Sequence, residues 1–134
     1  MRAVVINEYG DANALKNTQL PRPVPSQGEV LVQVNAVGLN PVDYKIRDGH
    51  LVDVFPVQFP RVLGGDISGV VTELGKGATE FSVGDEVYFS NPLDRDGGYA
   101  DYVSVEEKFL YRKPPSLSHT EAASLPVVAL TAIQ

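Results

Sequence analysis

The fold of this chain is constrained most by a series of short β-branched runs that glycine or proline closes within a few residues. The clearest run extends from Glu29 to Val37, where Val30, Val32, Val34 and Ala36 fall on one face of an alternating pattern. A repeat of two residues is that of a β-strand. Glycine and proline at the ends of such runs stop them from joining into long helices. The sequence therefore predicts a mostly β fold.

Six further runs are predicted to be strands. With the first, the predicted strands span residues 3–6, 15–20, 29–37, 67–74, 86–90, 99–105 and 109–112. About seven short strands in one domain are typical of a barrel or a sandwich. Gly69 lies inside one strand and predicts a bulge or a close backbone contact. Residues 50–62, which include Pro56 and Pro60, are predicted to form a packed but irregular loop.

Three short helices are predicted between and after the strands. Asn40 is a good N-cap residue with a proline after it, and Gly49 can end the helix that begins there. Ser118 and Glu121 have the spacing of a capping box, which opens a second helix. Pro126 suits the first position of a third.

Length, charge and cysteine content narrow the possible functions. The 134 residues fit one domain, and a net charge of −6 lacks the positive field that nucleic acid or an anionic membrane would require. The absence of cysteine excludes disulfides, thiolate metal sites and a thiol nucleophile. No segment reaches the roughly 18 apolar residues of a membrane span, and the first apolar run is too short for a secretory signal. We therefore expect a cytoplasmic protein without nucleic-acid or membrane partners.

Six segments, taken together and in order, resemble the quinone oxidoreductase (zeta-crystallin-like) branch of the zinc-independent medium-chain dehydrogenase/reductases. They are GEVLV (28–32), GLNPVD (38–43), GGDISGVV (64–71), VGDEV (83–87), GGYADYV (97–103) and EAASLP (121–126). The resemblance implies a GroES-like β-barrel with a few short helices, in which residues 1–134 form the catalytic domain.

The resemblance also implies a Rossmann domain downstream, because residues 130–132 match the segment that precedes that domain in the family. The turn at Gly75-Lys76-Gly77 is no substitute for it. Glu80 stands where the third glycine of a dinucleotide-binding fingerprint belongs. We therefore expect the cofactor to be bound mainly by the downstream domain.

The positions that hold zinc in related dehydrogenases have lost their ligands. By the family's pattern, Asn40 stands at the position of a zinc-binding cysteine, and Gly64-Gly65-Asp66 replaces a Gly-His-Glu triplet. His50 and His119 are the only histidines, and we expect both to be solvated. Without thiolates, these residues supply too few nitrogen and sulfur ligands for catalytic zinc. The sequence therefore predicts a zinc-free site.

The resemblance implies hydride transfer from NADPH to a quinone or to the β-carbon of an α,β-unsaturated carbonyl. A conjugated carbonyl delocalises the incoming negative charge, so hydrogen-bond donors can replace a metal. The partner is thus a small molecule, and the family implies a homodimer for the full-length protein.

Three candidate catalytic residues lie at and after residue 40. Asn40 is predicted to donate to the acceptor or the nicotinamide, although capping of the helix alone also explains it. Related enzymes often have a tyrosine where this chain has Lys45, and Tyr44 is one place earlier. Lys45 is a candidate to bind cofactor or polarise a carbonyl, and Tyr44 to donate a proton or bind substrate. Exposed helix positions are the alternative for both.

Three further residues are candidates for ligand binding. Asp66 and Asn91 are predicted to contact substrate, and Thr131 matches a threonine close to the nicotinamide in the family. A turn or cap role explains Asp66 equally well, and Thr131 is alternatively one exposed helix position.

Two other functions remain open. Within the family, the protein is alternatively a dedicated enoyl or alkenal reductase. Outside catalysis, it is a stand-alone GroES-like binding or chaperonin-like module, which would assemble into rings.

Overall fold

The computed structural model describes residues 1–133. Its elements follow in the order β1 (Arg2–Ile6), η1 (Ala12–Ala14), β2 (Leu15–Gln19), β3 (Glu29–Gly38), α1 (Pro41–Asp48), β4 (Arg61–Val62), β5 (Asp66–Leu74), β6 (Glu86–Ser90), β7 (Tyr102–Glu106), η2 (Glu107–Phe109), β8 (Tyr111–Arg112), α2 (His119–Ala123) and α3 (Pro126–Ile133). None of the helices in this part of the chain is both long and apolar enough to cross a membrane.

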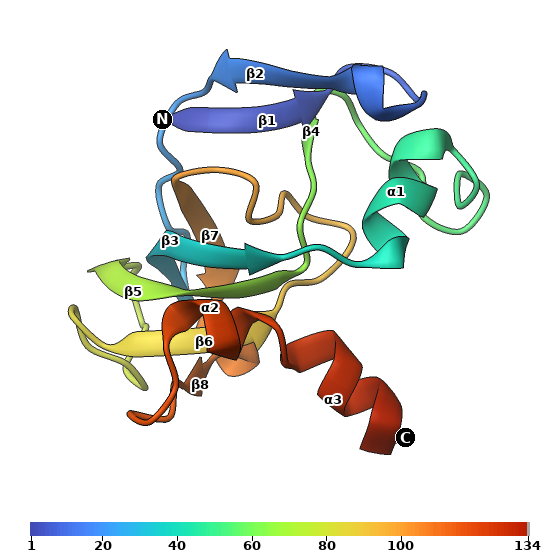
Figure 1. Cartoon of the computed structure of the whole chain (residues 1–134). Helices are drawn as coiled ribbons and strands as arrows, with labels where there is room; N and C mark the ends of the chain where they lie inside the picture. The colour runs from blue at the N-terminus through green and yellow to red at the C-terminus, as the bar shows by residue number, and fades with distance from the viewer. Residues whose placement is uncertain (134) are drawn as a thin grey trace.

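The strands form two antiparallel sheets, which Figure 1 shows one above the other. The smaller has the order β2-β1-β4 and the larger β7-β3-β5-β6-β8. The mostly β prediction is confirmed, but the sheets do not close into one hydrogen-bonded barrel. β1 pairs with β2 and β4, and it is joined to the segment before β7 by one isolated bridge, between Ala3 and Ala100, and by an ion pair of Arg2 with Asp101 at 3.0 Å.

The main hydrophobic core lies on β3 and its neighbours. Val30, Leu31 and Val32 of β3 have no exposed surface, and β3 pairs with β5 on one side and β7 on the other. The alternating pattern predicted this strand correctly, and its central place explains why it is apolar on both faces. The end of β3 leads directly into Asn40.

Gly69 in β5 marks a close backbone contact, as the sequence predicted. A Cβ atom there would lie 2.1 Å from the carbonyl oxygen of Gln33 in β3. The register of the two strands also shifts between Val34 and Ala36, which leaves Asn35 as an extra residue on β3. Such a bulge bends a strand, here shortly before the turn to α1.

Two predicted strands differ from the structure. The strand predicted over 99–105 begins only at Tyr102, because the N–H groups of residues 97–99 donate to the carbonyls of residues 62–64 instead. The strand predicted over 109–112 is a 3-10 turn followed by the two residues of β8. The Glu107 carboxylate holds this turn by accepting the N–H groups of Thr79 and Glu80 at 3.0 and 2.8 Å.

The three predicted helices are confirmed. α1 begins after Asn40 and ends at Gly49, which has a left-handed φ of 84°. Ser118 and Glu121 form the expected capping box of α2, with both bonds at 3.1 Å. α3 begins at Pro126.

The expectation that His119 is solvated was wrong. Its Nδ1 lies 2.7 Å from the hydroxyl of Ser68, which is fully buried in β5, and its Nε2 lies 3.2 Å from Glu86. The Ser68 hydroxyl also lies within hydrogen-bond distance of the Val87 carbonyl, at 3.1 Å. Through these contacts with β5 and β6, His119 connects α2 to the large sheet.

A buried ionic network joins the loop at residues 91–98 to the large sheet. Arg95 lies 2.6 Å from Glu29 Oε1, while the Ser104 hydroxyl and the Ser26 N–H donate to Oε2 at 2.7 and 2.9 Å. Burial alone would raise the pKa of Glu29, but the bonds from Ser26, Ser104 and Arg95 together lower it. The carboxylate is therefore stabilised in its charged form.

Replacing Glu29 with glutamine should cost about 2 kcal/mol of stability at pH 7, since hydrogen bonds to charged groups contribute about that much. Because the folded pKa is lowered, the contribution is present above the unfolded pKa and is lost as pH falls through the folded value. Urea unfolding at pH 7 and pH 4 measures this. The control is Glu73→Gln, an exposed residue whose nearest cation is Arg22 at 3.9 Å. An equal loss for Glu29→Gln at both pH values would contradict the ionic interpretation.

Candidate active site

Asn40 occupies the N-cap position of α1, but its side chain does not cap the helix. The Asn40 backbone N–H donates to Asp43 Oδ2 at 2.9 Å, and Asp43 N–H donates to the Asn40 carbonyl at 3.0 Å. The side chain of Asn40 makes no capping bond. Its Nδ2 donates instead to Asp66 Oδ2 at 3.1 Å. An amide nitrogen carries two N–H donors, so the Asn40 amide has one more to offer a ligand.

Asp66 is the buried centre of the site. It is the first residue of β5, is 1% exposed, and also accepts the N–H of Val127 at 3.2 Å on both oxygens. Val127 is the second residue of α3, where a negative charge is favourable because the helix begins there. One carboxylate thus ties β5 to the start of α1 and to α3.

The environment of Asp66 shifts its protonation. Burial raises the pKa of Asp66, and the hydrogen bonds from Asn40 and Val127 only partly oppose this effect. The negative charge of Asp43 raises the pKa of Asp66 as well. The site therefore holds an amide donor beside a carboxyl that is harder to ionise than usual.

Asp43 and Gly64 form the structural support beneath Asn40. Asp43 is 6% exposed, and its Oδ1 accepts the N–H of Gly64 at 3.1 Å. Gly64 has a φ of +99°, and a Cβ there would lie 2.6 Å from the ring of Tyr99. Any other residue at 64 would be strained and would clash. Burial and the Asp43 carboxylate raise the pKa of Tyr99, so its hydroxyl stays protonated.

Asn91 holds the loop at residues 91–98 against the site. It is 3% exposed, its N–H donates to the Gly65 carbonyl at 2.7 Å, and its Nδ2 donates to the Asp96 carbonyl at 2.9 Å. No atom of residues 1–133 donates to its buried Oδ1. In the chain alone, Asn91 therefore positions backbone, and its contact with substrate stays a prediction.

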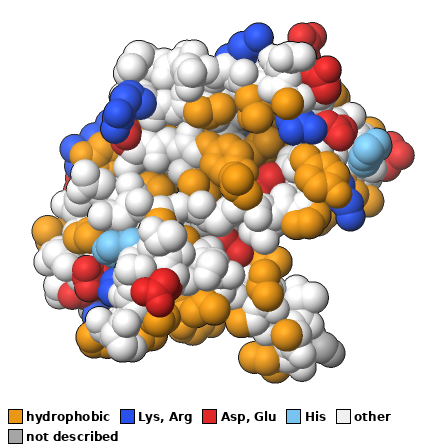
Figure 2. Space-filling model, viewed as in Figure 1, with side chains coloured by type: hydrophobic (Ala, Val, Ile, Leu, Met, Phe, Trp, Pro, Cys, Tyr) orange, Lys and Arg blue, Asp and Glu red, His pale blue; other side chains and the backbone are white. Residues whose placement is uncertain are grey.

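Tyr44, Lys45 and Thr131 are all exposed, and no hydrogen bond or ion pair of their side chains is found within residues 1–133. Figure 2 shows a notch between the body of the molecule and α3, with hydrophobic side chains on both sides. α1, which carries Tyr44 and Lys45, and α3, which carries Thr131, flank this notch (Figure 1). The structure brings Asn40 and Asp66 together; Tyr44, Lys45 and Thr131 are exposed on α1 and α3, and their roles stay predictions.

The positions that match the zinc ligands of related enzymes do gather here. Asn40 contacts Asp66, and Gly65 precedes it. A Cβ at Gly65 would come no closer than 3.9 Å to Leu93, so the backbone leaves room for a side chain there. Within the described residues, no group of three or more His, Cys, Asp or Glu side chains is placed to hold a metal ion.

The sequence reasoning missed the roles of Asp43 and Tyr99. Asp43 entered the sequence analysis only as the last residue of the segment GLNPVD, yet its carboxylate also accepts the N–H of Gly64, which is 21 residues away. Tyr99 packs on the same glycine. An acidic residue at the third position of a helix is a signal for the bond that Asp43 accepts from the Asn40 N–H. No local pattern predicts the bond that Asp43 accepts from a distant glycine.

Replacing Asp66 with asparagine should change how stability depends on pH. Because the folded pKa of Asp66 is raised, wild-type stability from this group is greatest below the unfolded pKa and falls as pH rises through the folded value. The variant lacks this loss, so its stability relative to wild type should rise between pH 3.5 and pH 7, on top of a constant cost for altered hydrogen bonds. Urea unfolding across that range, with exposed Asp53→Asn as control, tests this. A difference that does not change with pH would refute it.

Comparison with known proteins places this geometry in a family. Residues 26–115 match the alcohol dehydrogenase GroES-like domain. A chloroplast envelope quinone oxidoreductase homolog from Arabidopsis thaliana is 38% identical over 135 residues, which are 100% of this chain and 41% of the relative.

Solved structures agree. An NAD-dependent alcohol dehydrogenase has a TM-score of 0.93 at 36% identity, covering 100% of this chain and 46% of its own. A mycobacterial protein complexed with NADPH has a TM-score of 0.89 at 30% identity, covering 99% of this chain and 40% of its own. The chain thus spans about two fifths of the length of the relatives it matches.

The matched region contains Asn40, Asp43, Gly64 and Asp66, so the family similarity extends over the site itself. It also contains five of the six segments that resemble the medium-chain dehydrogenase/reductases. This chain belongs to the alcohol dehydrogenase GroES-like domain family, and the relatives it is similar to include quinone oxidoreductases.

Proposed function

We propose that the protein is an NAD(P)H-dependent reductase of quinones or α,β-unsaturated carbonyls that works without zinc. The observation that carries the proposal is the Asn40 amide, which uses one N–H on Asp66 and leaves the other for a ligand. The relatives named as quinone oxidoreductase and as an NADPH complex support the reaction class and the cofactor.

The chemistry fits a site with donors and no metal. A bound nicotinamide cofactor would supply the hydride. Asn40 would polarise the carbonyl oxygen on which negative charge develops, because a donor fixed in a water-poor site stabilises such charge strongly. Asp66 would act by orienting the Asn40 amide, and Asp43 by fixing the turn before α1.

The proposal also includes the roles predicted for the residues that would contact the cofactor and the acceptor. Asn40, Lys45 and Thr131 would contact the cofactor, and Tyr44 and Asn91 the acceptor. Exposed Lys45 and Thr131 on the two helices beside the notch suit a ligand that enters between them. NADPH as the cofactor and a homodimer of the full-length protein also belong to this proposal.

Zinc independence is supported by the donor set. Asn40 offers an amide where zinc relatives have a thiolate, and Gly65 offers no side chain at all. Asp66 is already engaged by Asn40 and Val127. One carboxylate without nitrogen or sulfur partners is a poor zinc site.

The purified full-length protein, with its downstream domain, should oxidise NADPH with a naphthoquinone or an enone and should not oxidise primary alcohols with NADP+, whereas residues 1–134 alone should be inactive. Activity should survive exhaustive dialysis against a chelator, because no metal takes part. The assay is the loss of NADPH absorbance across a panel of acceptors. Chain-length series of enones measured beside quinones would separate a dedicated enoyl or alkenal reductase from a quinone reductase. Inactivity with every acceptor, together with a heptameric ring by light scattering, would favour the chaperonin-like alternative.

Asn40→Ala should lower kcat by about a hundredfold, the effect of removing one donor from developing negative charge. It should also cost about 2 kcal/mol of stability, because the buried Asp66 carboxylate loses the hydrogen bond from the Asn40 amide, while the bond from the Asn40 backbone N–H to Asp43 remains. The matched control is Asn17→Ala, which removes the same amide from an exposed position of β2 in the other sheet. Equal kcat values for wild type and Asn40→Ala would refute the role of Asn40 while leaving the reaction class to the acceptor panel.

A further inference from the structure

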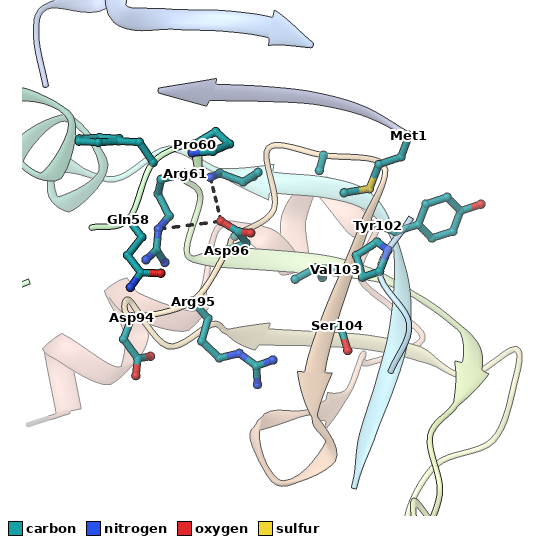
Figure 3. Close-up of a pocket in the computed structure, with 15 residues that line it drawn as sticks. Met1, Gln58, Pro60, Arg61, Asp94, Arg95, Asp96, Tyr102, Val103 and Ser104 are labelled. Atoms are coloured by element: carbon teal, nitrogen blue, oxygen red, sulfur yellow. Dashed lines mark hydrogen bonds and ion pairs between the residues drawn. The ribbon is translucent and has the colours of Figure 1, made fainter. Parts of the chain in front are cut away.

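A second pocket, separate from the Asn40–Asp66 site, opens between the small sheet and β7. It has a volume of about 440 Å³ and is lined by residues of β4, β7 and the loop at 91–98. Figure 3 shows it from the side opposite to Figure 1, with Arg61 and Arg95 on one side and Tyr102 and Ser104 on the other. Cavities of about 300–1,000 Å³ are the size that binds small organic molecules.

Arg61 in the wall of this pocket is buried without an adequate counter-ion. The residue is 8% exposed, and among residues 1–133 its one ion pair is with Asp96, at 3.9 Å from Nε. That separation exceeds a hydrogen bond, and no described atom accepts from the buried Nε–H. Asp96 is itself 63% exposed in its side chain, and its Oδ1 accepts the Val62 N–H at 3.0 Å.

Arg61 differs from half-buried Arg95 and from buried Lys113. Arg95 has Glu29 at 2.6 Å, and Lys113 donates to the carbonyls of Leu117 and Pro114 and lies 3.5 Å from Glu86. A guanidinium removed from water is unfavourable unless an anion or good acceptors bind it. The chain supplies these for Arg95 and Lys113 but not for Arg61.

We propose that this pocket binds a small organic monocarboxylate, with its carboxylate on Arg61 and its apolar body against Val62, Val103 and Phe59. The planar fork of arginine matches a carboxylate through two parallel N–H bonds. Asp94 and Asp96 also line the pocket and would repel a dianion such as phosphate. This argument does not depend on the proposed reductase reaction.

The ligand class can be tested with octanoate, 1-octanol and inorganic phosphate as probes of the purified protein. Calorimetric titration should show octanoate binding about tenfold or more tightly than 1-octanol, as expected for a hydrogen bond to a charged group, and no binding of phosphate. Amide chemical shifts should move at Gly97, Ala100 and Tyr102 and stay constant at Asn40 and Gly65. Equal affinity for octanoate and 1-octanol, or shifts confined to Asn40 and Gly65, would overturn the proposal.

Variants assign the binding to Arg61. Arg61→Met keeps an apolar stem without the charge and should weaken octanoate about tenfold or more, while Arg61→Lys keeps the charge without the fork and should weaken it less. The control is Arg2→Met, which removes an 84% exposed arginine side chain paired with Asp101 and should leave octanoate affinity unchanged. Unchanged octanoate binding by Arg61→Met would overturn the proposal. If Arg61→Met does not fold, the Arg61→Lys variant and the amide chemical shifts of the wild type are the test. Wild-type octanoate affinity in Arg61→Lys, together with shifts only outside the pocket, would reject the proposal.

Discussion

The buried carboxylate of Asp66 is the interaction on which the site depends. It sits at the first residue of β5 with 1% of its surface exposed, and it accepts from Asn40 and from the N-terminus of α3. A buried charge is tolerated only where hydrogen bonds satisfy it. The position of the Asn40 amide, and the junction of α3 with the sheet, therefore follow from where β5 places one acidic side chain. The raised pKa of Asp66 reflects how incompletely these bonds offset its burial.

The sequence predicted elements better than it predicted their contacts. The alternation in β3 and the capping residues of α1 and α2 are local signals, and the structure confirms them. The strand expected from Tyr99 fails at its start because those N–H groups bond to residues more than thirty positions earlier. The failure of the two sheets to close into a barrel has the same cause. The strand propensity of a segment does not say which other strand it will pair with.

The same limit applies to the site. Asn40 was correctly placed as an N-cap residue, but local reasoning left its side chain open between a ligand contact and capping of the helix. The structure gives that task to Asp43 and turns the amide toward Asp66, which is 26 residues away. His119 and Asn91 show the same pattern, because each is defined by a partner on another element. Resemblance to a family suggested these positions, and the backbone path explains why Asn40 and Asp66 face one another.

Gly65, the residue before Asp66, differs from its neighbour Gly64 in how much space surrounds it. Its backbone is not in a left-handed conformation, and a Cβ atom there would meet nothing closer than 3.9 Å. Its neighbour Gly64, in contrast, is locked as glycine by the ring of Tyr99. The backbone therefore has space for a Cβ atom at 65 and none at 64. A side chain can be added at 65 without moving the main chain, which makes this position the place to introduce a new group next to Asp66.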